Sequence, residues 1–409
     1  MTRIAYVSAD LGVPIFGTKG CSIHAQEILR ALLGRGARVD LFTTSGAGEV
    51  PPSLAAVRLY PLPRPPKGAP APREQAAQAG NVTLRAALEA GGPFDLVYER
   101  YSLWSFAGME FAREAGLPGL LEVNAPLIEE QAQYRVLVDR AGAEAIAERA
   151  FGAAHSLLAV SKEVAAWLEG FPVARGKVQV VPNGVNPERF PENCRPAPST
   201  PPGVFTIGFV GTLKAWHGLV LLVEAFALLH RRQPQTRLLI VGDGPERENM
   251  AADLAARGLA ATAQFTGAVP PGQVPALLAS MDVAVAPYPK LSNFYFSPLK
   301  VYEYMAAGLP VIASRIGQLE TLIEPEANGL LVPPGDSGAL CAALERLQRE
   351  PELRHRLGQA ARALVLRDYT WRAVAQRIFR LAGLESQSGK ANWPGASSIE
   401  REAGINRKS

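Results

Sequence analysis

The sequence has few cysteines and lacks the common metal-binding patterns. Its three cysteines, Cys21, Cys194 and Cys341, are far apart and odd in number. No Cys-x-x-Cys pair or Cys/His zinc spacing occurs, which argues against a disulfide framework and a structural zinc site. No Asp-x-Asp occurs either, so no such carboxylate pair is placed to hold a divalent ion. We therefore expect no metal and a reducing, cytoplasmic environment.

Long runs of one character are also missing. No apolar run approaches the roughly 20 residues that cross a bilayer. The N-terminus leads directly into a strand-like segment at 4–7, so we expect no signal peptide. The formal net charge is +4, and no dense Lys/Arg run precedes the C-terminal tail, so no nucleic-acid partner is expected. Gly-x-Ser-x-Gly and the P-loop pattern are absent, which argues against an α/β-hydrolase and a P-loop enzyme.

What the sequence does contain is an alternation of short apolar runs and amphipathic stretches. A chain of 409 residues suits two domains rather than one core. Strands that are apolar on both faces and separated by helices predict parallel sheets covered by helices, an α/β class. The predicted strands lie at 4–8, 38–42, 57–60, 95–98, 119–123, 156–160 and 178–181, then at 206–210, 237–241, 263–266, 283–286, 310–313 and 329–332.

The domain boundaries follow from the proline distribution. Five prolines crowd into residues 191–203 without apolar periodicity, which is typical of a semi-rigid linker. We predict an N-terminal domain at 1–190 and a C-terminal domain at 204–370. A final amphipathic helix is expected within 371–384. A polar tail at 385–409 is expected to be disordered.

The most informative motif is the stretch at 297–310. Ser297 is a favourable N-cap and Pro298 suits the first helical position, so a helix is expected with free N–H groups that can bind a phosphate. Lys300 and Glu303 share a face of this helix. A cation at the phosphate end and a carboxylate one turn later could bind a phosphate and ribose hydroxyls. The alternative is an ordinary cap with a surface ion pair.

Two glycine-containing turns follow strands of the second domain. The loop 211–218 contains Gly211, Lys214 and His217, which offer close backbone approach and donors to an anion. The turn Gly242-Asp243-Gly244 lacks the third glycine of a dinucleotide fingerprint, so a tight strand-to-helix turn is the first interpretation.

A third glycine-rich loop lies near the N-terminus. Gly17 and Gly20 precede a predicted helix at 22–33 that carries His24 in its first turn. In an open α/β sheet, this loop lies at the carboxyl ends of the strands, where ligands bind. For His24, a structural role and a functional role are about equally supported by the sequence.

Together these motifs resemble the retaining glycosyltransferases of family 4, which have the GT-B fold. The resemblance covers about 4–381 and rests on ordered motifs. These are 181–186, 211–218, 241–245, 265–267, and 303–308 with 310–313. It implies two Rossmann-like domains whose parallel sheets face a central cleft. It also implies an N-terminal acceptor domain, a C-terminal nucleotide-sugar domain, and a last helix that crosses back to the first domain.

The resemblance also assigns roles to residues of the donor site. Glu303 matches the second of the family's two signature glutamates and would bind the nucleotide ribose. The first glutamate falls on Tyr295, which leaves the identity of the sugar open. The positions of an Arg and a Lys on the diphosphate are Thr212 and His217. Lys214, Lys300 and a protonated His217 would share that task. The predicted site residues are His24, Asn124, Lys214 and Lys300 as catalytic, and Gly17, Gly20, Gly211, Thr212, His217, Gly242, Gly244, Tyr295, Ser297, Leu299 and Glu303 as donor-binding.

The implied activity is metal-independent transfer of a sugar from a UDP- or GDP-sugar to a hydroxyl, with the anomeric configuration kept. Asn124 takes the place of a histidine found in many relatives. In the family, the departing phosphate helps to remove the acceptor proton, so no protein base is strictly needed. Alternatives are a GT-B nucleotide-sugar 2-epimerase and a catalytically weak binding protein. No cofactor is expected beyond the nucleotide-sugar co-substrate. The acceptor (saccharide, lipid-linked or small molecule), peripheral membrane contact and the oligomeric state stay open.

Overall fold

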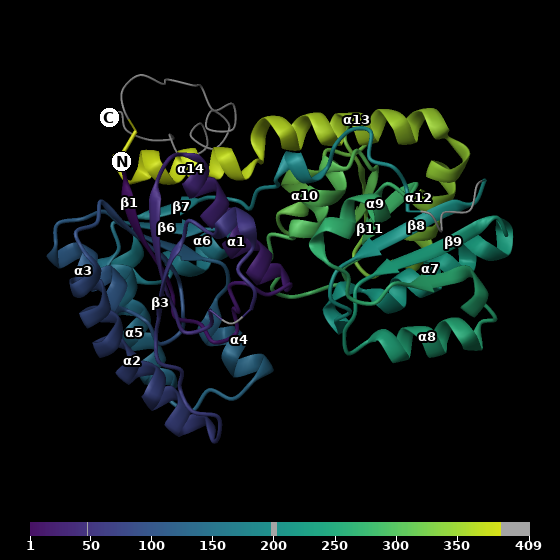
Figure 1. Cartoon of the computed structure of the whole chain (residues 1–409). Helices are drawn as coiled ribbons and strands as arrows, with labels where there is room; N and C mark the ends of the chain where they lie inside the picture. The colour runs from purple at the N-terminus through teal and green to yellow at the C-terminus, as the bar shows by residue number, and fades with distance from the viewer. Residues whose placement is uncertain (47, 198–202, 386–409) are drawn as a thin grey trace, which may run out of the picture.

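The computed structural model describes residues 1–46, 48–197 and 203–385 as two α/β lobes (Figure 1). The predicted tail at 385–409 lies outside the described residues except for Glu385, and so do residues 198–202 of the predicted linker. Each lobe has one parallel sheet with helices on both faces, which confirms the predicted α/β class.

In the described part of the chain, the N-terminal sheet has seven strands, all parallel to their neighbours. In spatial order they are β3 (Arg58–Pro61), β2 (Arg38–Thr43), β1 (Arg3–Ser8), β4 (Leu96–Arg100), β5 (Gly119–Val123), β6 (Ser156–Ala159) and β7 (Val178–Val180). Successive side chains point to opposite faces. Along β1, Ala5 and Val7 therefore enter one core cluster, and Ile4 and Tyr6 enter the other.

The helices of this lobe divide between the two faces of the sheet. One face is covered by α2, α3, α5 and α6, and the other by α1 and α14 (Trp371–Leu381). The bounds are α1 (Gly20–Gly34), α2 (Pro70–Gly91), α3 (Ala107–Glu114), α4 (Leu127–Tyr134), α5 (Arg140–Ala153) and α6 (Lys162–Glu169), with the 3-10 turns η1 (Pro52–Leu54), η2 (Pro172–Ala174) and η3 (Pro187–Arg189). Helix α2 begins at Pro70, a residue type that suits the first turn of a helix.

The C-terminal sheet has six described strands in the order β10 (Ala263–Phe265), β9 (Thr236–Val241), β8 (Phe205–Val210), β11 (Val283–Ala286), β12 (Val311–Ser314) and β13 (Leu330–Val332). Its helices are α7 (Leu219–Arg232), α8 (Arg247–Ala256), α9 (Val274–Leu278), α10 (Leu299–Ala306), α11 (Leu319–Leu322), α12 (Ser337–Arg349) and α13 (Pro351–Asp368), with η4 (Ala215–His217), η5 (Ala260–Thr262) and η6 (Pro271–Gln273). Helices α7, α8 and α12 cover one face, and α9, α10 and α13 cover the other.

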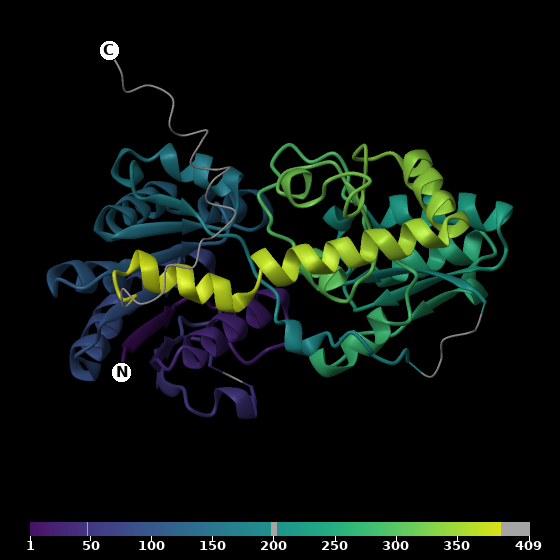
Figure 2. The same cartoon turned by 90° about the horizontal axis from the view of Figure 1, so that it is seen from above.

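Within the described residues, the chain passes between the lobes twice, and the two passages lie side by side. Val185 N–H donates to the Tyr369 carbonyl at 2.8 Å, and Trp371 N–H donates to the Val185 carbonyl at 3.1 Å. Beyond this contact, α14 (Trp371–Leu381) leaves the C-terminal lobe and lies along the N-terminal one, as Figure 2 shows from above. Trp371 and Phe379 join the core cluster that contains α1.

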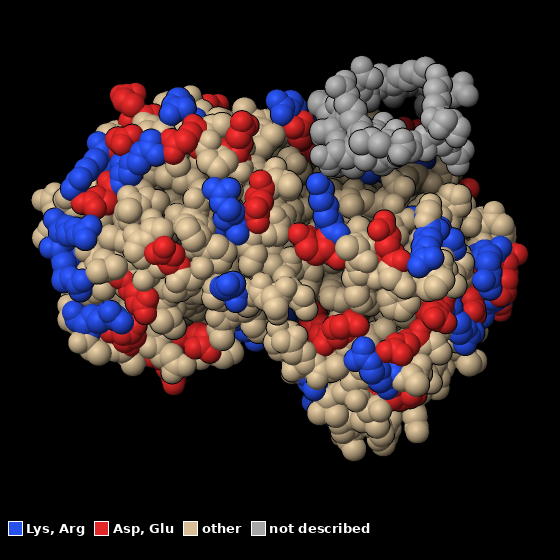
Figure 3. Space-filling model, turned by 180° about the vertical axis from the view of Figure 1, so that it is seen from behind, with Lys and Arg blue, Asp and Glu red and all other residues tan. Residues whose placement is uncertain are grey.

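The surface seen from behind has a notch between the lobes, and basic and acidic side chains are interspersed over that face (Figure 3). Among the described residues, no helix is both long enough and apolar enough to cross a bilayer.

Candidate active site

Lys300 places a buried ammonium next to the first loop of the C-terminal sheet. Its Nζ has no hydrogen-bond partner among the described residues and lies 4.2 Å from the ring centre of Phe209. Burial lowers the pKa of Lys300 to about 7. Gly211 has a φ of 140°, and a Cβ there would come within 3.0 Å of Nζ, so glycine lets the loop approach the amine. An unpaired buried cation of this kind favours an anionic ligand.

Helix α10 presents its first turn without a side-chain cap. The helix starts at Leu299 with Pro298 as N-cap residue, and no side chain accepts a hydrogen bond from its first N–H groups. The prediction that Ser297 caps this helix is therefore wrong. Asn183 of the N-terminal lobe holds that residue instead, since its N–H donates to Ser297 Oγ at 3.4 Å and its Nδ2 donates to the Ser297 carbonyl at 2.8 Å. The uncapped N–H groups remain suited to a phosphate.

His217 lies in the loop 211–218, and its imidazole is neutral. Burial and the neighbouring Lys300 lower the pKa of His217 to about 3. Its Nδ1 lies 2.7 Å from the carbonyl oxygen of the exposed Thr212, so Nδ1 carries the proton and donates. The lowered pKa disfavours the suggested protonated imidazole at neutral pH in the ligand-free protein. Lys214 lies over the Trp216 ring at 5.5 Å and remains a second nearby cation.

Gly242 and Gly244 pack closely against the backbone of the loop 211–218. The N–H of Gly211 donates to the Val241 carbonyl at 2.9 Å, and Leu213 N–H donates to the Asp243 carbonyl at 2.9 Å. A Cβ on Gly242 would meet the Gly211 carbonyl, and one on Gly244 would meet the Leu213 backbone. The two turns therefore pack backbone to backbone, in line with the tight-turn interpretation.

Glu303 forms an ion pair that the sequence did not suggest. Its Oε1 accepts a hydrogen bond from Arg189 Nη1 at 2.9 Å, and Arg189 comes from η3 between the lobes. Burial raises the pKa of Glu303, and the guanidinium opposes that shift. The Glu303 side chain keeps 17% of its surface exposed, so a ligand can still reach it. Arg189 was missed because it is separated from Glu303 by 114 positions.

His24 is buried in the N-terminal lobe instead of lining an open cleft. Only 3% of the residue is exposed. Its Nε2 is in direct contact with Oε1 of Glu122 on β5, and its ring lies 5.0 Å from that of Trp371 in an edge-on arrangement. Burial opposes ionisation of Glu122, but His24 and the more distant Arg100 lower the pKa of Glu122 overall. This arrangement favours the structural role for His24.

Asn124 follows β5, and its Nδ2 is buried. In the glycine-rich loop before α1, Gly17 is crowded by Pro14 and Ser22, whereas Gly20 faces open space. Leu299 packs against the core cluster of the N-terminal lobe. Of the predicted residues, Gly211, Lys300 and the His217 loop lie together at one end of α10, whereas His24 lies in the other lobe.

Tyr295 crosses between the lobes. Its ring packs against the N-terminal core, and its hydroxyl donates to Glu130 of α4 at 3.2 Å. Ser161 Oγ donates to the Tyr295 carbonyl at 3.0 Å. Tyr134 at the end of α4 also contacts the Trp216 ring, with centres 6.0 Å apart. Helix α4 therefore touches both the Tyr295 segment and the Lys214 loop.

A pocket of about 600 Å³ opens in the N-terminal lobe next to α4. It lies beyond the carboxyl ends of β1 to β4, between α2 and α4. Its polar lining includes Asp10, Gln131 and Arg135, and its apolar lining includes Trp104. Glu130 belongs to the same lining and is the residue that binds Tyr295. The pocket thus borders the segment that precedes α10.

Among the described residues, no group of three or more His, Cys, Asp or Glu side chains could hold a metal ion.

Comparison with known proteins gives two adjacent family matches. Residues 18–189 match the model of "Glycosyltransferase Family 4", and residues 192–364 match that of "Glycosyl transferases group 1". D-inositol 3-phosphate glycosyltransferase of Pseudarthrobacter chlorophenolicus is 26% identical over 367 residues, which are 84% of this chain and 85% of the relative.

Solved structures share the arrangement of the lobes. Sucrose-phosphate synthase of Thermosynechococcus elongatus superposes with a TM-score of 0.73 at 23% identity, over 93% of this chain and 98% of that one. HepE of Anabaena, solved in complex with UDP-glucose, gives a TM-score of 0.68 at 18% identity, over 93% and 99% of the two chains. These likenesses show that the fold is GT-B, with two Rossmann-like domains.

Proposed function

Since this chain belongs to the family 4 glycosyltransferases, we propose that it transfers a hexose from a UDP- or GDP-sugar to a hydroxyl acceptor. The transfer retains the anomeric configuration and needs no metal ion. The observation that carries this proposal is the unpaired ammonium of Lys300 beside the uncapped start of α10, with Glu303 one turn further along.

The diphosphate of the donor would lie at the start of α10. Burial disfavours the charged form of Lys300, and an anion there would restore it. The backbone N–H groups of the first turn and Lys214 would add donors. Stabilising the negative charge of the leaving diphosphate is the main demand on the enzyme, because a leaving group departs more easily when its charge is neutralised.

The ribose would bind to Glu303. A carboxylate accepts hydrogen bonds from two neighbouring hydroxyls, and the bond to Arg189 uses Oε1 only. HepE was solved with UDP-glucose, which makes a uridine donor the first to test. The acceptor would enter through the pocket beside α4, and the relative that acts on inositol 3-phosphate favours a compact polyol.

In the proposed reaction, the acceptor hydroxyl attacks on the face that the diphosphate leaves. The departing phosphate oxygen takes the acceptor proton, so Asn124 would only orient a hydroxyl. No cofactor takes part. A cytoplasmic location belongs to the same proposal, because Cys21, Cys194 and Cys341 are free thiols.

The test is a thermal-shift panel of nucleoside diphosphates and nucleotide sugars, followed by titration calorimetry. A ligand that binds the folded state raises the Tm by mass action. We expect Glu303→Gln to weaken binding of the best nucleoside diphosphate by about 1–3 kcal/mol, the worth of a charge-assisted hydrogen bond. Equal affinity in that variant would remove Glu303 from the site. Slow hydrolysis of the donor would separate an enzyme from a binding protein.

A further inference from the structure

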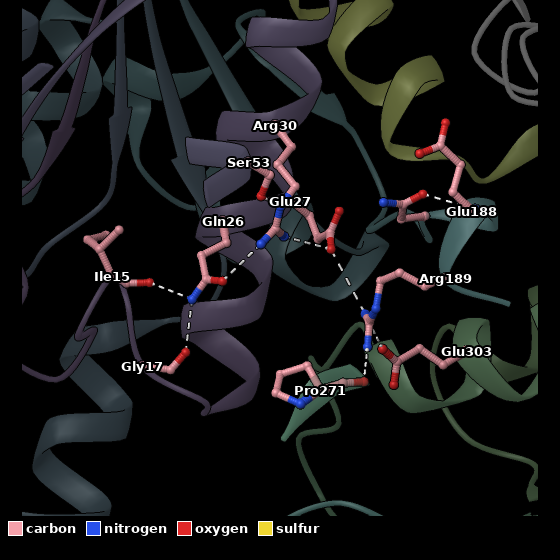
Figure 4. A network of polar contacts seen from close by, with 11 residues as sticks. Ile15, Gly17, Gln26, Glu27, Arg30, Ser53, Glu188, Arg189, Pro271 and Glu303 are labelled. Carbon is pink, nitrogen blue, oxygen red and sulfur yellow. Dashed lines mark hydrogen bonds and ion pairs between the residues drawn. The ribbon is translucent and has the colours of Figure 1, made fainter. Parts of the chain in front are cut away.

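A continuous chain of polar contacts leads from Glu303 to the glycine-rich loop of the N-terminal lobe (Figure 4). Arg189 Nη1 lies 2.9 Å from Glu303 Oε1 and 3.9 Å from Glu27 Oε1. Arg30 Nη1 donates to the same oxygen of Glu27 at 2.9 Å. The chain therefore joins α10, η3 and α1, one element from each lobe and one from the connection between them.

The chain continues along α1 to the loop backbone. Arg30 Nη2 donates to Gln26 Oε1 at 3.3 Å. Gln26 Nε2 donates to the carbonyls of Ile15 and Gly17, each at 2.9 Å. Because Gln26 is buried, these bonds fix the position of the loop that opens α1. The glycine-rich loop before α1, which the sequence predicted to bind a ligand, is thus connected to Glu303 by the same network of polar contacts.

Arg189 is shared by two carboxylates. The Glu27 side chain is only 3% exposed, and that of Glu303 is 17% exposed. Burial raises the pKa of Glu27, which Arg30 and Arg189 oppose. The negative charge of Glu27 in turn favours the neutral form of Glu303. Removing the guanidinium would leave Glu27 paired with Arg30, whereas Glu303 would lose its cation and stay close to the negative charge of Glu27, which favours the neutral form of Glu303.

Other groups around Glu303 do not replace Arg189. Lys300 lies one turn earlier on α10 beside Phe209. Tyr304, on the same helix, bonds through its hydroxyl to the Val210 backbone. From α13, Arg362 Nη1 donates to the carbonyls of Phe190 and Ala306.

We infer that Arg189 is a positioning residue for the nucleotide site. It keeps Glu303 ionised and oriented for a ribose, and it ties that carboxylate through Glu27 to the Gly17 loop of the opposite lobe. The inference rests on the proposed function, in which Glu303 binds the ribose. Binding of a nucleoside diphosphate then depends on Arg189, a residue of η3 between the lobes, through its contact with Glu303.

The test is calorimetric titration of the full-length protein with UDP and GDP at pH 6.0 and pH 8.5. The variants are Arg189→Met, Arg189→Lys and the double variant Glu27→Gln/Arg189→Met. Arg257→Met is the matched control, because it removes an equal charge from an exposed pair with Asp253 on α8. For Arg189→Met we expect about tenfold weaker binding at pH 6.0, the size of a weakened charge-assisted hydrogen bond to the ribose. We expect a smaller loss at pH 8.5, because the neutral form of Glu303 becomes less populated as the pH rises.

Two further results are expected from the same series. Arg189→Lys keeps most of the affinity, and Glu27→Gln restores most of what Arg189→Met loses, because it removes the competing carboxylate. In turnover assays, the donor KM rises more than kcat falls. If Arg189→Met lowers the Tm too far to be assayed, the double variant and Arg189→Lys carry the comparison.

The outcomes separate this inference from the proposed function. If the wild type binds no nucleoside diphosphate, or Glu303→Gln binds as well as the wild type, the proposed function fails and the inference with it. If Glu303→Gln weakens binding but Arg189→Met matches Arg257→Met at both pH values, only the role of Arg189 is overturned. A loss in Arg189→Met that is equal at both pH values and is not relieved by Glu27→Gln would also overturn it, because that pattern indicates a general structural defect.

Discussion

The hydroxyl of Tyr295 donates a hydrogen bond to Glu130 Oε2 at 3.2 Å, from the C-terminal lobe to α4 of the N-terminal lobe. Tyr295 stands where the family resemblance places a glutamate. Two carboxylates would face each other at this contact if that glutamate were present, and they would repel. The tyrosine instead supplies a donor to Glu130, which lines the 600 Å³ pocket. The tyrosine that stands in place of the family's glutamate at position 295 therefore has a hydrogen-bond partner, Glu130, in α4.

The first prediction is that the effects of substitutions at Tyr295 and Glu130 depend on each other. Tyr295→Glu should lower kcat/KM by about tenfold or more, because a second carboxylate next to Glu130 disfavours the contact between the lobes. Adding Glu130→Gln should recover part of that loss, since the amide removes the repulsion. The comparison is a double-mutant cycle on kcat/KM, with Tyr295→Phe as the variant that removes only the hydroxyl. Additive losses in the cycle would show that the two side chains act independently.

A second prediction concerns α14. Trp371 is 5% exposed, and its ring lies edge-on to His24. Trp371→Ala should lower the free energy of unfolding by roughly 3–5 kcal/mol, as for other large aromatic residues in cores, and a chain ending at Asp368 should aggregate. Thermal unfolding measures the first effect, with the exposed neighbour Arg372→Ala as control. A soluble, active chain ending at Asp368 would mean that α14 is dispensable.

The sequence predicted best the strands that are apolar on both faces. The bounds of β5 and β11 match the predicted 119–123 and 283–286. These segments are buried on both sides, so their apolar runs are continuous and easy to read. The start of α2 was not readable in the same way. Residues 70–81 contain Ala, Gln and Gly without an apolar stripe, and only Pro70 and Pro72 mark the first turn.

Contacts between residues far apart in the sequence limited how much of the site could be predicted. Serine is a residue type that often caps helices, which is why Ser297 was predicted as an N-cap. Asn183 in the other lobe forms hydrogen bonds to Ser297 instead, and no local sequence pattern encodes that contact. Lys300 and Glu303 were found because both lie on one helix face. Arg189 belongs to the same site but lies in a different element, so only the fold brings it to Glu303.

A third prediction follows from the lowered pKa of Lys300, about 7, against about 10.4 in an unfolded chain. Between these values the unfolded chain binds more protons than the folded one. The free energy of unfolding of the ligand-free protein should therefore rise with pH across this window, and Lys300→Met should flatten that rise. Denaturant titrations from pH 7 to pH 10 measure it. An unchanged slope in Lys300→Met would assign the effect to another group.

The same amine predicts proton uptake on ligand binding. A diphosphate beside Nζ favours the charged form, so binding of a nucleoside diphosphate near pH 7 should take up a fraction of a proton and weaken as the pH rises above 7. Calorimetry in buffers of different ionisation enthalpy measures this uptake. Lys300→Met should abolish it, whereas Lys214→Met should leave it in place. Uptake that disappears only in Lys214→Met would identify Lys214 as the diphosphate cation.

The last prediction concerns the product and the metal. We expect the product to keep the anomeric configuration of the donor, and we expect turnover to continue in EDTA. The first expectation rests on family membership and is checked by NMR of the anomeric proton. The second rests on charge: Lys300, Lys214 and the uncapped start of α10 can meet the diphosphate without a divalent ion. The two expectations can fail separately. An inverted anomeric centre would overturn the retaining mechanism and leave the nucleotide site intact. Activity lost in EDTA and restored by magnesium or manganese would show that these cations are not sufficient, because a metal ion would then be carrying part of the diphosphate charge.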